Sequence, residues 1–171
     1  VLMGEIYGFP GSEHIVAEHA VNRKVGLEIL DMIRELREDF IQKTGYSIES
    51  VNPTPGNKAG GITTLVEKSM GNIKKMGTAP IQGIIQVGER PPYPGLWIVD
   101  NRKEGVDSFN ITSFALAYAH AAVFSSGRGT PVGNAVMPVI KITGNSKRYE
   151  HLKSMFDFNA SVVMEGADLR A

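Results

Sequence analysis

The stretch LWIVDN, residues 96–101, shows most directly how this chain is expected to fold. It begins with the four apolar residues Leu96–Val99 and then becomes polar at Asp100 and Asn101. A short apolar run of this kind is typical of a strand that is buried on both faces of a sheet. Five such strands are expected, because similar runs occur at residues 1–7, 81–87, 121–124 and 136–142.

The segments between the predicted strands carry the spacing of helices. In residues 22–44 apolar side chains recur every three or four positions, and charged side chains occupy the other faces. Further helices are predicted at residues 12–20, 63–75, 112–120 and 147–155. The expected fold class is therefore α/β: one three-layer, Rossmann-like domain over residues 1–171, with a mainly parallel sheet flanked by helices.

Composition excludes several classes of protein. Of the 171 residues, 42% are hydrophobic and 21% are charged, which is typical of a folded globular domain. Lys plus Arg and Asp plus Glu both number 18, so no basic field predicts a nucleic-acid or membrane partner. The absence of cysteine excludes disulfides, thiolate zinc sites and cysteine nucleophiles from these residues.

The sequence also bears on location and on context. No apolar run reaches the roughly 18–20 residues that span a bilayer, and no signal peptide is visible, so we expect a cytoplasmic protein. The chain opens on a predicted strand without an initiator Met, so we expect a region cut from a larger protein.

Polar side chains follow four of the predicted strands. They are Ser12, Glu13 and His14 after the first, Asp100 and Asn101 after the third, SSGRGTP at residues 125–131 after the fourth, and TGN at residues 143–145 after the fifth. The carboxyl ends of parallel strands share one edge of a sheet, and ligands bind at that edge. The sequence therefore predicts a site there.

The loop NPTPGNKAGGITT, residues 52–64, has a rigidly specified backbone and runs directly into a predicted helix. Its prolines and glycines fix unusual backbone angles, and a helix N-terminus attracts polar or anionic ligands. A well-defined connection without a ligand is the alternative. The Gly-rich segments lack the spacings of dinucleotide and phosphate loops, and the five-residue spacing of His14 and His19 does not match a zinc-peptidase helix.

Eight stretches, in order, resemble the galactarate dehydratase/altronate dehydratase family, which also includes sulfolactate sulfo-lyase. They are Gly11–His14, Asn52–Asn57 with Gly60–Thr64, Glu67–Ser69 with Gly71, Gly77–Pro80, Gly95–Leu96, Phe124–Pro131, Pro138–Ile142 and Asp157–Ala160. The resemblance covers nearly the whole chain and implies the C-terminal part of the catalytic region, without the family's N-terminal SAF-like and intervening domains. The chain departs from the family pattern at Ser125 and Ser126, where threonines are usual, and at Ser161, where glycine is usual.

The resemblance implies a metal-dependent lyase that removes water from a sugar acid to give a 2-keto-3-deoxy acid. The implied cofactor is a divalent metal, iron(II), with manganese or magnesium as alternatives. It also implies that the missing N-terminal domains of the parent enzyme complete the site, so that the fragment alone is inactive; a homo-oligomer is left open. Two alternatives remain: a sulfolactate sulfo-lyase, or a non-catalytic anion- or nucleotide-binding module.

Within this reading, Glu67, Lys68 and His14 are the catalytic candidates. Glu67 and Lys68 are neighbours on a helix, about 100° apart, so only one of them is expected to face the site. His14 is a candidate for proton transfer or, with Glu13, for metal binding. The competing role of His14 is to cap the short helix.

The substrate-binding candidates carry amides, hydroxyls and one guanidinium group. Arg128 is expected to bind a carboxylate, or else to shape its loop through a salt bridge. The others, which could bind substrate or only stabilise their own turns, are Asn52, Asn57, Thr63, Ser125, Ser126 and Thr130. The whole hypothesis requires the loops at residues 52–64 and 125–131 to meet around a common cavity.

Overall fold

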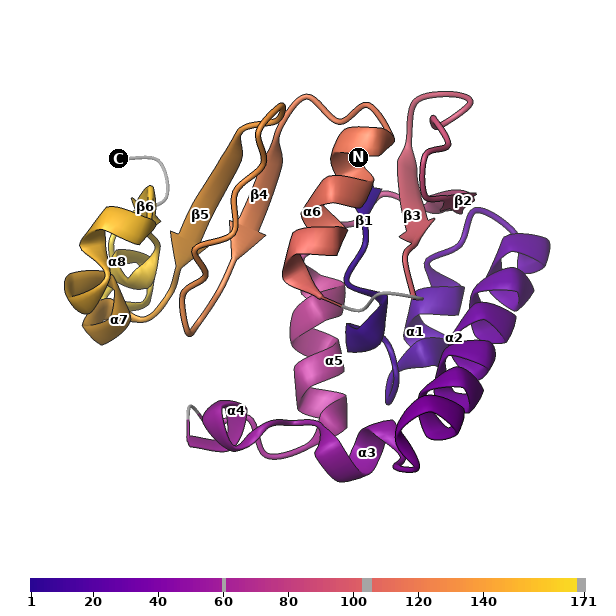
Figure 1. The fold of residues 1–171 in the computed structure, drawn as a ribbon, viewed down its shortest axis with the longest axis horizontal. Coiled ribbons are helices and arrows are strands. Elements are labelled where there is room, and N and C mark those ends of the chain that lie inside the picture. Colours follow the sequence, from indigo (N-terminus) through magenta and orange to yellow (C-terminus); the bar gives the residue numbers. More distant parts are fainter. Residues whose placement is uncertain (60, 103–105, 169–171) are drawn as a thin grey trace.

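The computed structural model describes residues 1–59, 61–102 and 106–168 of the chain (Figure 1). Its strands form two parallel three-stranded sheets, ordered β1-β3-β2 and β4-β5-β6. They are β1 (Leu2–Met3), β2 (Ile81–Gln86), β3 (Leu96–Asp100), β4 (Ala122–Ser125), β5 (Val139–Thr143) and β6 (Phe158–Asn159). The predicted α/β fold is confirmed, with the parallel strands divided between two sheets.

Helices flank both sheets. In chain order they are η1 (Ile6–Gly8), α1 (Glu13–Glu18), α2 (Arg23–Thr44), α3 (Ile48–Val51), α4 (Pro55–Ala59), α5 (Leu65–Lys74), α6 (Asp107–Leu116), α7 (Ser146–His151), η2 (Lys153–Met155) and α8 (Ser161–Met164). Gly60, part of the loop motif after α4, lies outside the described residues.

Strand β3 organises the core of the first sheet, because all five of its residues are buried. Successive side chains of a strand point to opposite faces. Leu96 and Ile98 accordingly pack with buried residues of α1, α2 and α5, while Trp97 and Val99 pack with Phe114 of α6. The first sheet is thus the middle of three layers, as the sequence predicts.

Helix α2 has clear signals at both ends. The Asn22 side chain accepts a hydrogen bond from the N–H of Val25 at 3.1 Å, and Gly45 ends the helix with φ of 74°. The helix buries Ile29 and Ile33 against the sheet and exposes its charged face. Neither α2 nor any other described helix is both long and apolar enough to cross a membrane.

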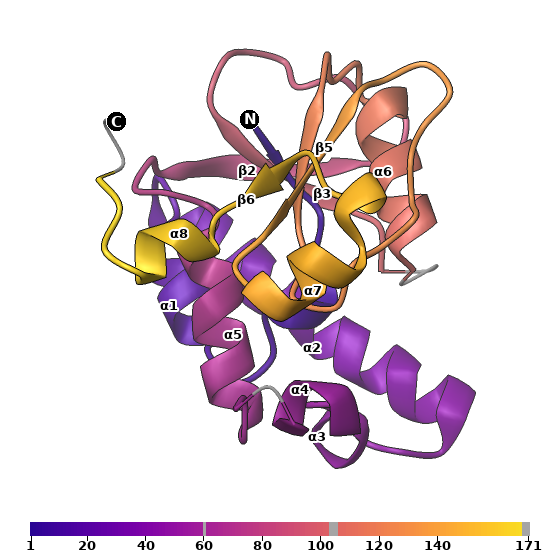
Figure 2. The same ribbon diagram turned by 90° about the vertical axis from the view of Figure 1, so that its left-hand side faces the viewer.

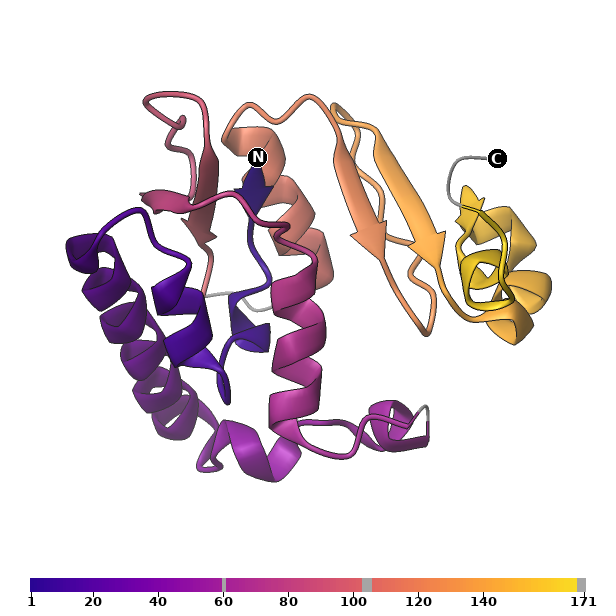
Figure 3. The same cartoon turned by 180° about the vertical axis from the view of Figure 1, so that it is seen from behind.

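Helix α6 lies between the two sheets in Figures 1 and 3, and Figure 2 views the molecule from the side of the second sheet. Phe114 packs against the Trp97 cluster of the first sheet and also against a cluster that contains Ile111, Ala122 and Met137. One helix therefore joins the two halves of the fold.

The structure corrects several predicted boundaries. Within the strand expected at residues 1–7, only Leu2–Met3 form a strand, because the helix η1 begins at Ile6. The strand expected at residues 136–142 is β5, which starts later. The helix expected at residues 147–155 divides into α7 and η2. Ser12 stands at the N-cap position of α1, but its side chain makes no capping bond.

The helix expected at residues 112–120 is α6, which begins five residues earlier and ends at Leu116. Asp107 stands in its first turn, where an acidic side chain favours the helix N-terminus. Its end is followed by Tyr118, whose φ of 64° is incompatible with a continuing right-handed helix. Apolar composition alone could not fix these limits.

Candidate active site

The carboxyl ends of β1 and β4 lie on the same side of the molecule, the side on which α4 is found (Figures 1 and 3). Glu5 follows β1 and Ser125 ends β4, and both line one cavity. Asp107, at the start of α6, lines it as well. Ligands of parallel α/β sheets bind at such an edge, so this is the candidate site.

The two loops on which the hypothesis depends are in contact. A Cβ atom on Gly56, in α4, would lie only 3.3 Å from Cζ and Nη1 of Arg128. The guanidinium group therefore lies directly on the glycine backbone, and the predicted meeting of the two loops is confirmed. A larger residue at position 56 would push Arg128 away.

The cavity has a volume of about 1140 Å³ and is lined by β1, α6 and β4. It reaches the predicted site at Ser125, whereas the described residues of the loop 52–64 are not part of its wall. The contact between Gly56 and Arg128 thus lies beside the cavity rather than within it. The expectation of one cavity shared by both loops is corrected in this respect.

Lys68 is held by the loop that precedes its helix. Its Nζ atom donates a hydrogen bond to Oδ1 of Asn52 at 2.7 Å, and the side chain is half-buried. Burial lowers the pKa of the Lys68 amine; the charge of Lys75 adds to this, and those of Glu5 and Asp107 oppose it. A lysine with a lowered pKa can act as a proton acceptor closer to neutral pH.

Asp107 belongs to the same group of charges. Burial raises the pKa of its carboxyl, the charge of Glu5 adds to the rise, and the charges of Lys75 and Lys68 oppose it. Lys75 also forms an ion pair with Glu5, with 3.0 Å between Nζ and Oε2. Amines and carboxyls whose pKa values shift toward neutrality are typical of acid–base sites, although structural ion-pair networks can produce the same effect.

Glu67 caps the N-terminus of its own helix. Its Oε2 atom accepts hydrogen bonds from the backbone N–H and hydroxyl of Thr63 and from the N–H of Thr64. Together with the bond from its own N–H to the Thr64 hydroxyl, these form a capping box at α5. The bonds from Thr63 and Thr64 hold the pKa of Glu67 below its ordinary value. Of the two neighbouring candidates, Lys68 faces the charge cluster.

Several substrate-binding candidates stabilise their own loops. Oδ1 of Asn57 accepts from the N–H and the hydroxyl of Thr54, at 3.1 and 2.9 Å. Oγ of Ser126 accepts from the Gly129 N–H at 3.0 Å, and the buried Thr130 hydroxyl accepts from the Val132 N–H at 3.3 Å. These bonds shape the loops around Arg128, and substrate binding by the same groups stays a prediction.

Glu13 and His14 lie in the first turn of α1. Oε1 of Glu13 accepts from Nη2 of Arg37 in α2 at 3.0 Å, and Oε2 accepts from the Gly11 N–H at 2.7 Å. Burial raises the pKa of Glu13, but the N–H groups of Glu13 and Gly11 and the Arg37 guanidinium together hold it below its ordinary value. Arg37 also pairs with Glu49. The Glu13 carboxylate is thus already neutralised by a cation.

The described residues do not assemble a metal centre from side chains alone. Within residues 1–59, 61–102 and 106–168, no three or more His, Cys, Asp or Glu side chains group so that they could hold an ion. His14 is exposed, and Glu13 is paired with Arg37. The proposed pair therefore does not fit as a complete metal site, and a role for it in metal binding stays a prediction.

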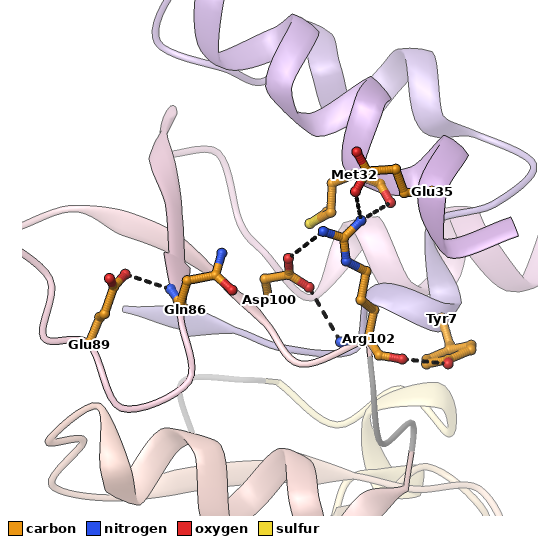
Figure 4. Close-up of polar contacts among 7 residues, drawn as sticks. All are labelled: Tyr7, Met32, Glu35, Gln86, Glu89, Asp100 and Arg102. Atoms are coloured by element: carbon orange, nitrogen blue, oxygen red, sulfur yellow. Dashed lines mark hydrogen bonds and ion pairs between the residues drawn. The ribbon is translucent and has the colours of Figure 1, made fainter. Parts of the chain in front are cut away.

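The polar residues after β3 have structural partners that tie the strand end to α2 and to η1. Arg102 pairs with Asp100 and with Glu35 of α2, and its carbonyl accepts a 2.6 Å hydrogen bond from the Tyr7 hydroxyl (Figure 4). Asn101 is buried and donates to Asn110 of α6. The segment after β3 is thus tied to α2 through Arg102.

Sequence reasoning missed Asp107, Glu5 and Asn72 as site residues. Asn72 lies on α5 one turn beyond Lys68 and is buried; its amide donates to the Glu5 carbonyl at 2.8 Å. Its Oδ1 has no partner among the described residues. The available signal was the spacing of Lys68, Asn72 and Lys75, which places all three on one side of a helix.

The sequence matches the family described as D-galactarate/altronate dehydratase, C-terminal, over residues 1–170. It is 36% identical over 155 residues to altronate dehydratase of Bacillus subtilis strain 168, covering 91% of this chain and 30% of that protein. It is 30% identical over 168 residues to galactarate dehydratase (L-threo-forming) of Escherichia coli K12, covering 98% and 31%.

A third relative has a different name. The beta subunit of (2R)-sulfolactate sulfo-lyase from Chromohalobacter salexigens is 29% identical over 165 residues, which cover 96% of this chain and 42% of that subunit. The chain spans about 30% of the length of the altronate dehydratases that it matches. With nearly every residue inside the family match, this chain belongs to the D-galactarate/altronate dehydratase family and corresponds to its C-terminal region.

Proposed function

We propose that this chain supplies the acid–base groups of a hydro-lyase, which removes water from a sugar acid of the galactarate or altronate type. The product is a 2-keto-3-deoxy acid. The observation that carries the proposal is the convergence at one sheet edge: Lys68 is fixed by Asn52 on one loop, and Arg128 of the other loop rests on Gly56. The family relationship supplies the reaction class.

The first step is removal of the proton on the carbon next to the carboxylate. In the proposal, neutral Lys68 accepts this proton at Nζ. Burial favours the neutral amine, and the Asn52 oxygen fixes the position of the nitrogen. A positioned base of this kind contributes about 10²- to 10⁴-fold to a rate.

The substrate carboxylate would be bound by Arg128. A guanidinium group presents two parallel N–H donors to a carboxylate, so it fixes orientation as well as charge. Arg128 is exposed, and its loop is held by the Ser126 and Thr130 hydroxyls. It is therefore free to bind an anion while its backbone stays in place.

The leaving hydroxyl requires a proton to depart as water, and we assign this proton to Asp107. Burial and the Glu5 charge favour its protonated form. The carbon–hydrogen electron pair then forms the new double bond as the carbon–oxygen bond breaks. Lys68 gains one proton, Asp107 loses one, and the enol product becomes the 2-keto acid; proton exchange with water restores both groups.

A divalent metal, iron(II) or alternatively manganese or magnesium, stays part of the proposal as a group that would stabilise the enediolate and the leaving oxygen. The described acidic and imidazole side chains do not complete a site for it. The steps above are therefore assigned to the protein's own side chains. We also propose that the 171 residues alone show little turnover, because the chain spans about 30% of the altronate dehydratases.

Sulfolactate is a second candidate substrate, because a relative over 96% of the chain is named for it. The proton removal would be unchanged, and sulfite would leave in place of water. Dehydration is favoured, because the Bacillus subtilis altronate dehydratase is 36% identical to this chain and the sulfo-lyase subunit is 29% identical.

The test is an assay with galactarate, altronate and (2R)-sulfolactate, with detection of 2-keto acid and of sulfite. It is done on the 171-residue chain and on a longer polypeptide, in which the other domains of the proposed parent enzyme accompany these residues. Both are assayed after chelation and re-addition of Fe²⁺, Mn²⁺ or Mg²⁺. In the active form, Lys68→Met is expected to lower kcat by about 10²- to 10⁴-fold. Lys74→Met, on the exposed side of the same helix, is the matched control. Full activity of Lys68→Met would contradict the assignment of the base.

A further inference from the structure

The two sheets present one open edge each to the same space. In the sheet β1-β3-β2 the edge strand on this side is β1, and in the sheet β4-β5-β6 it is β4. Figures 1 and 3 show that the two strands run in the same direction on either side of α6. Strand edges carry backbone N–H and C=O groups that readily pair with another strand.

The hydrogen bonds of β4 show which of its amides are free. The Ala122 N–H donates to the Pro138 carbonyl, and the Ser126 N–H donates to the Ile142 carbonyl, each at 2.9 Å. Because backbone groups alternate along a strand, the N–H groups of Val123 and Ser125 point to the opposite edge. This edge faces the cavity, which both residues line.

The edge of β1 has the same arrangement. The Val1 carbonyl accepts the N–H of Trp97 in β3 at 2.9 Å, so Val1 and Met3 direct their backbone groups toward β3. Leu2 and Gly4 direct theirs to the other side, and both line the cavity. Two rows of backbone groups that have no partner among the described residues therefore face one space.

The space between the edges is large and mostly apolar. Its volume is about 1140 Å³, and α6 forms one wall. Val123 is 65% exposed there, which is unusual for the middle of a parallel strand. The apolar residues that line this space include Leu2, Ile111, Phe114, Ala122, Val123 and Phe124.

We propose that the apolar part of this space, between the two strand edges, receives one extended apolar β-strand and leaves the polar end at Glu5 and Asp107 to the candidate site. The strand pairs with β1 and β4 together and joins the two sheets into a single seven-stranded sheet. The strand comes from polypeptide outside residues 1–171. The chain spans only 30% and 31% of its dehydratase relatives, so they contain other segments from which such a strand can come. Parallel strands of one α/β domain normally form a continuous sheet, and the inserted strand restores that continuity.

The test measures amide hydrogen exchange, resolved by residue, in the 171-residue chain and in the longer polypeptide. The amides of Val123 and Ser125 are expected to exchange at least about ten times more slowly in the longer form. The amides of Ala122 and Ser126, already bonded to β5, are the internal control and are expected to change little. Equal exchange of Val123 and Ser125 in the two forms would overturn the proposal.

A proline variant tests the same edge independently. Val123→Pro removes an N–H on the cavity side and none from the β4–β5 ladder, so the 171-residue chain is expected to keep its melting temperature. The same change is expected to lower that of the longer polypeptide. Phe124→Pro, which removes an N–H facing β5, is expected to destabilise both. If Val123→Pro leaves the melting temperature of the longer polypeptide unchanged, the proposal is overturned. So would concentration-dependent protection of Val123 in the 171-residue chain, because a second copy would then fill the space.

Discussion

The two sheets have the same parallel architecture but very different degrees of burial. All five residues of β3 are buried between α6 on one face and α1, α2 and α5 on the other. In the second sheet, by contrast, large apolar residues remain exposed: Val123 is 65% exposed, Ile140 43% and Phe158 55%. Strand pairing alone is therefore not what stabilises either half. The number of covering layers makes the difference.

The candidate site lies where the two halves meet. Lys68 and Asp107 come from helices associated with the first sheet, and Arg128 comes from the loop after β4. A well-buried half thus positions the proposed acid and base, and a less covered half supplies the proposed carboxylate ligand. Substitutions in the two halves are expected to separate effects on stability from effects on binding.

The largest expected contrast is in stability. Ile98 is fully buried in β3. Its change to alanine is expected to lower the unfolding free energy by about 2–5 kcal/mol, because a cavity remains. Ile140 lies in β5, the central strand of the second sheet, and is 43% exposed, so its change to alanine is expected to cost less than about 1 kcal/mol. Urea unfolding of the two variants measures both values. Equal losses would show that the second sheet is as well packed as the first.

The next contrast concerns binding. Arg128→Lys keeps the charge but loses the paired N–H donors, so KM for the acid substrate is expected to rise about 10- to 100-fold in the active form, with little change in stability. Arg148→Lys, on the exposed helix α7, is the matched control. If Arg128→Lys leaves KM unchanged but destabilises the fold, the guanidinium group serves the loop and not the substrate.

Much of this arrangement could be predicted from the sequence. The apolar runs predicted the strands β1 to β5. The loops at residues 52–64 and 125–131 were expected to meet, as the contact of Gly56 with Arg128 confirms. The choice between Glu67 and Lys68 could not be made from their spacing. It depends on the capping bonds of Thr63 and Thr64, which are made only once the α5 N-terminus has formed.

Two features were out of reach for physical reasons. Strand runs show that a sheet forms but not which edges pair, so the division into two sheets could not be predicted from residues 1–171 alone. The charge cluster required Glu5 and Asp107, about 100 residues apart, to come together at the end of α5. Neither of these residues is part of a motif, and only the packing of α6 brings Asp107 near Lys68.

A smaller effect tests the cap that fixes α5 and hence Lys68. Thr64→Ala removes the hydroxyl that accepts the Glu67 N–H at 3.2 Å, and is expected to cost about 1 kcal/mol of unfolding free energy. Thr64→Ser keeps the bond and is the control. The pKa of Glu67 is lowered in the folded state, so its contribution is present above its unfolded pKa and decreases as pH falls through the folded value. No difference between the two variants would show that the capping box is dispensable.

The smallest expected effect concerns the pH dependence of stability at Asp107. Its pKa is raised in the folded state by burial and by Glu5, so the folded chain binds the proton more tightly than the unfolded chain. The stability of the native sequence should therefore fall as pH rises from the unfolded to the folded pKa of this group. Asp107→Asn stays neutral, so its stability relative to the native protein should increase across that window and level off above it. Lys68 and Lys75 partly offset the rise in the pKa of Asp107. The change in unfolding free energy should therefore be smaller than the change caused by Thr64→Ala. A difference in unfolding free energy that decreases with pH would mean that the two lysines dominate Asp107, and this group could not then supply the proton that the proposed dehydration requires.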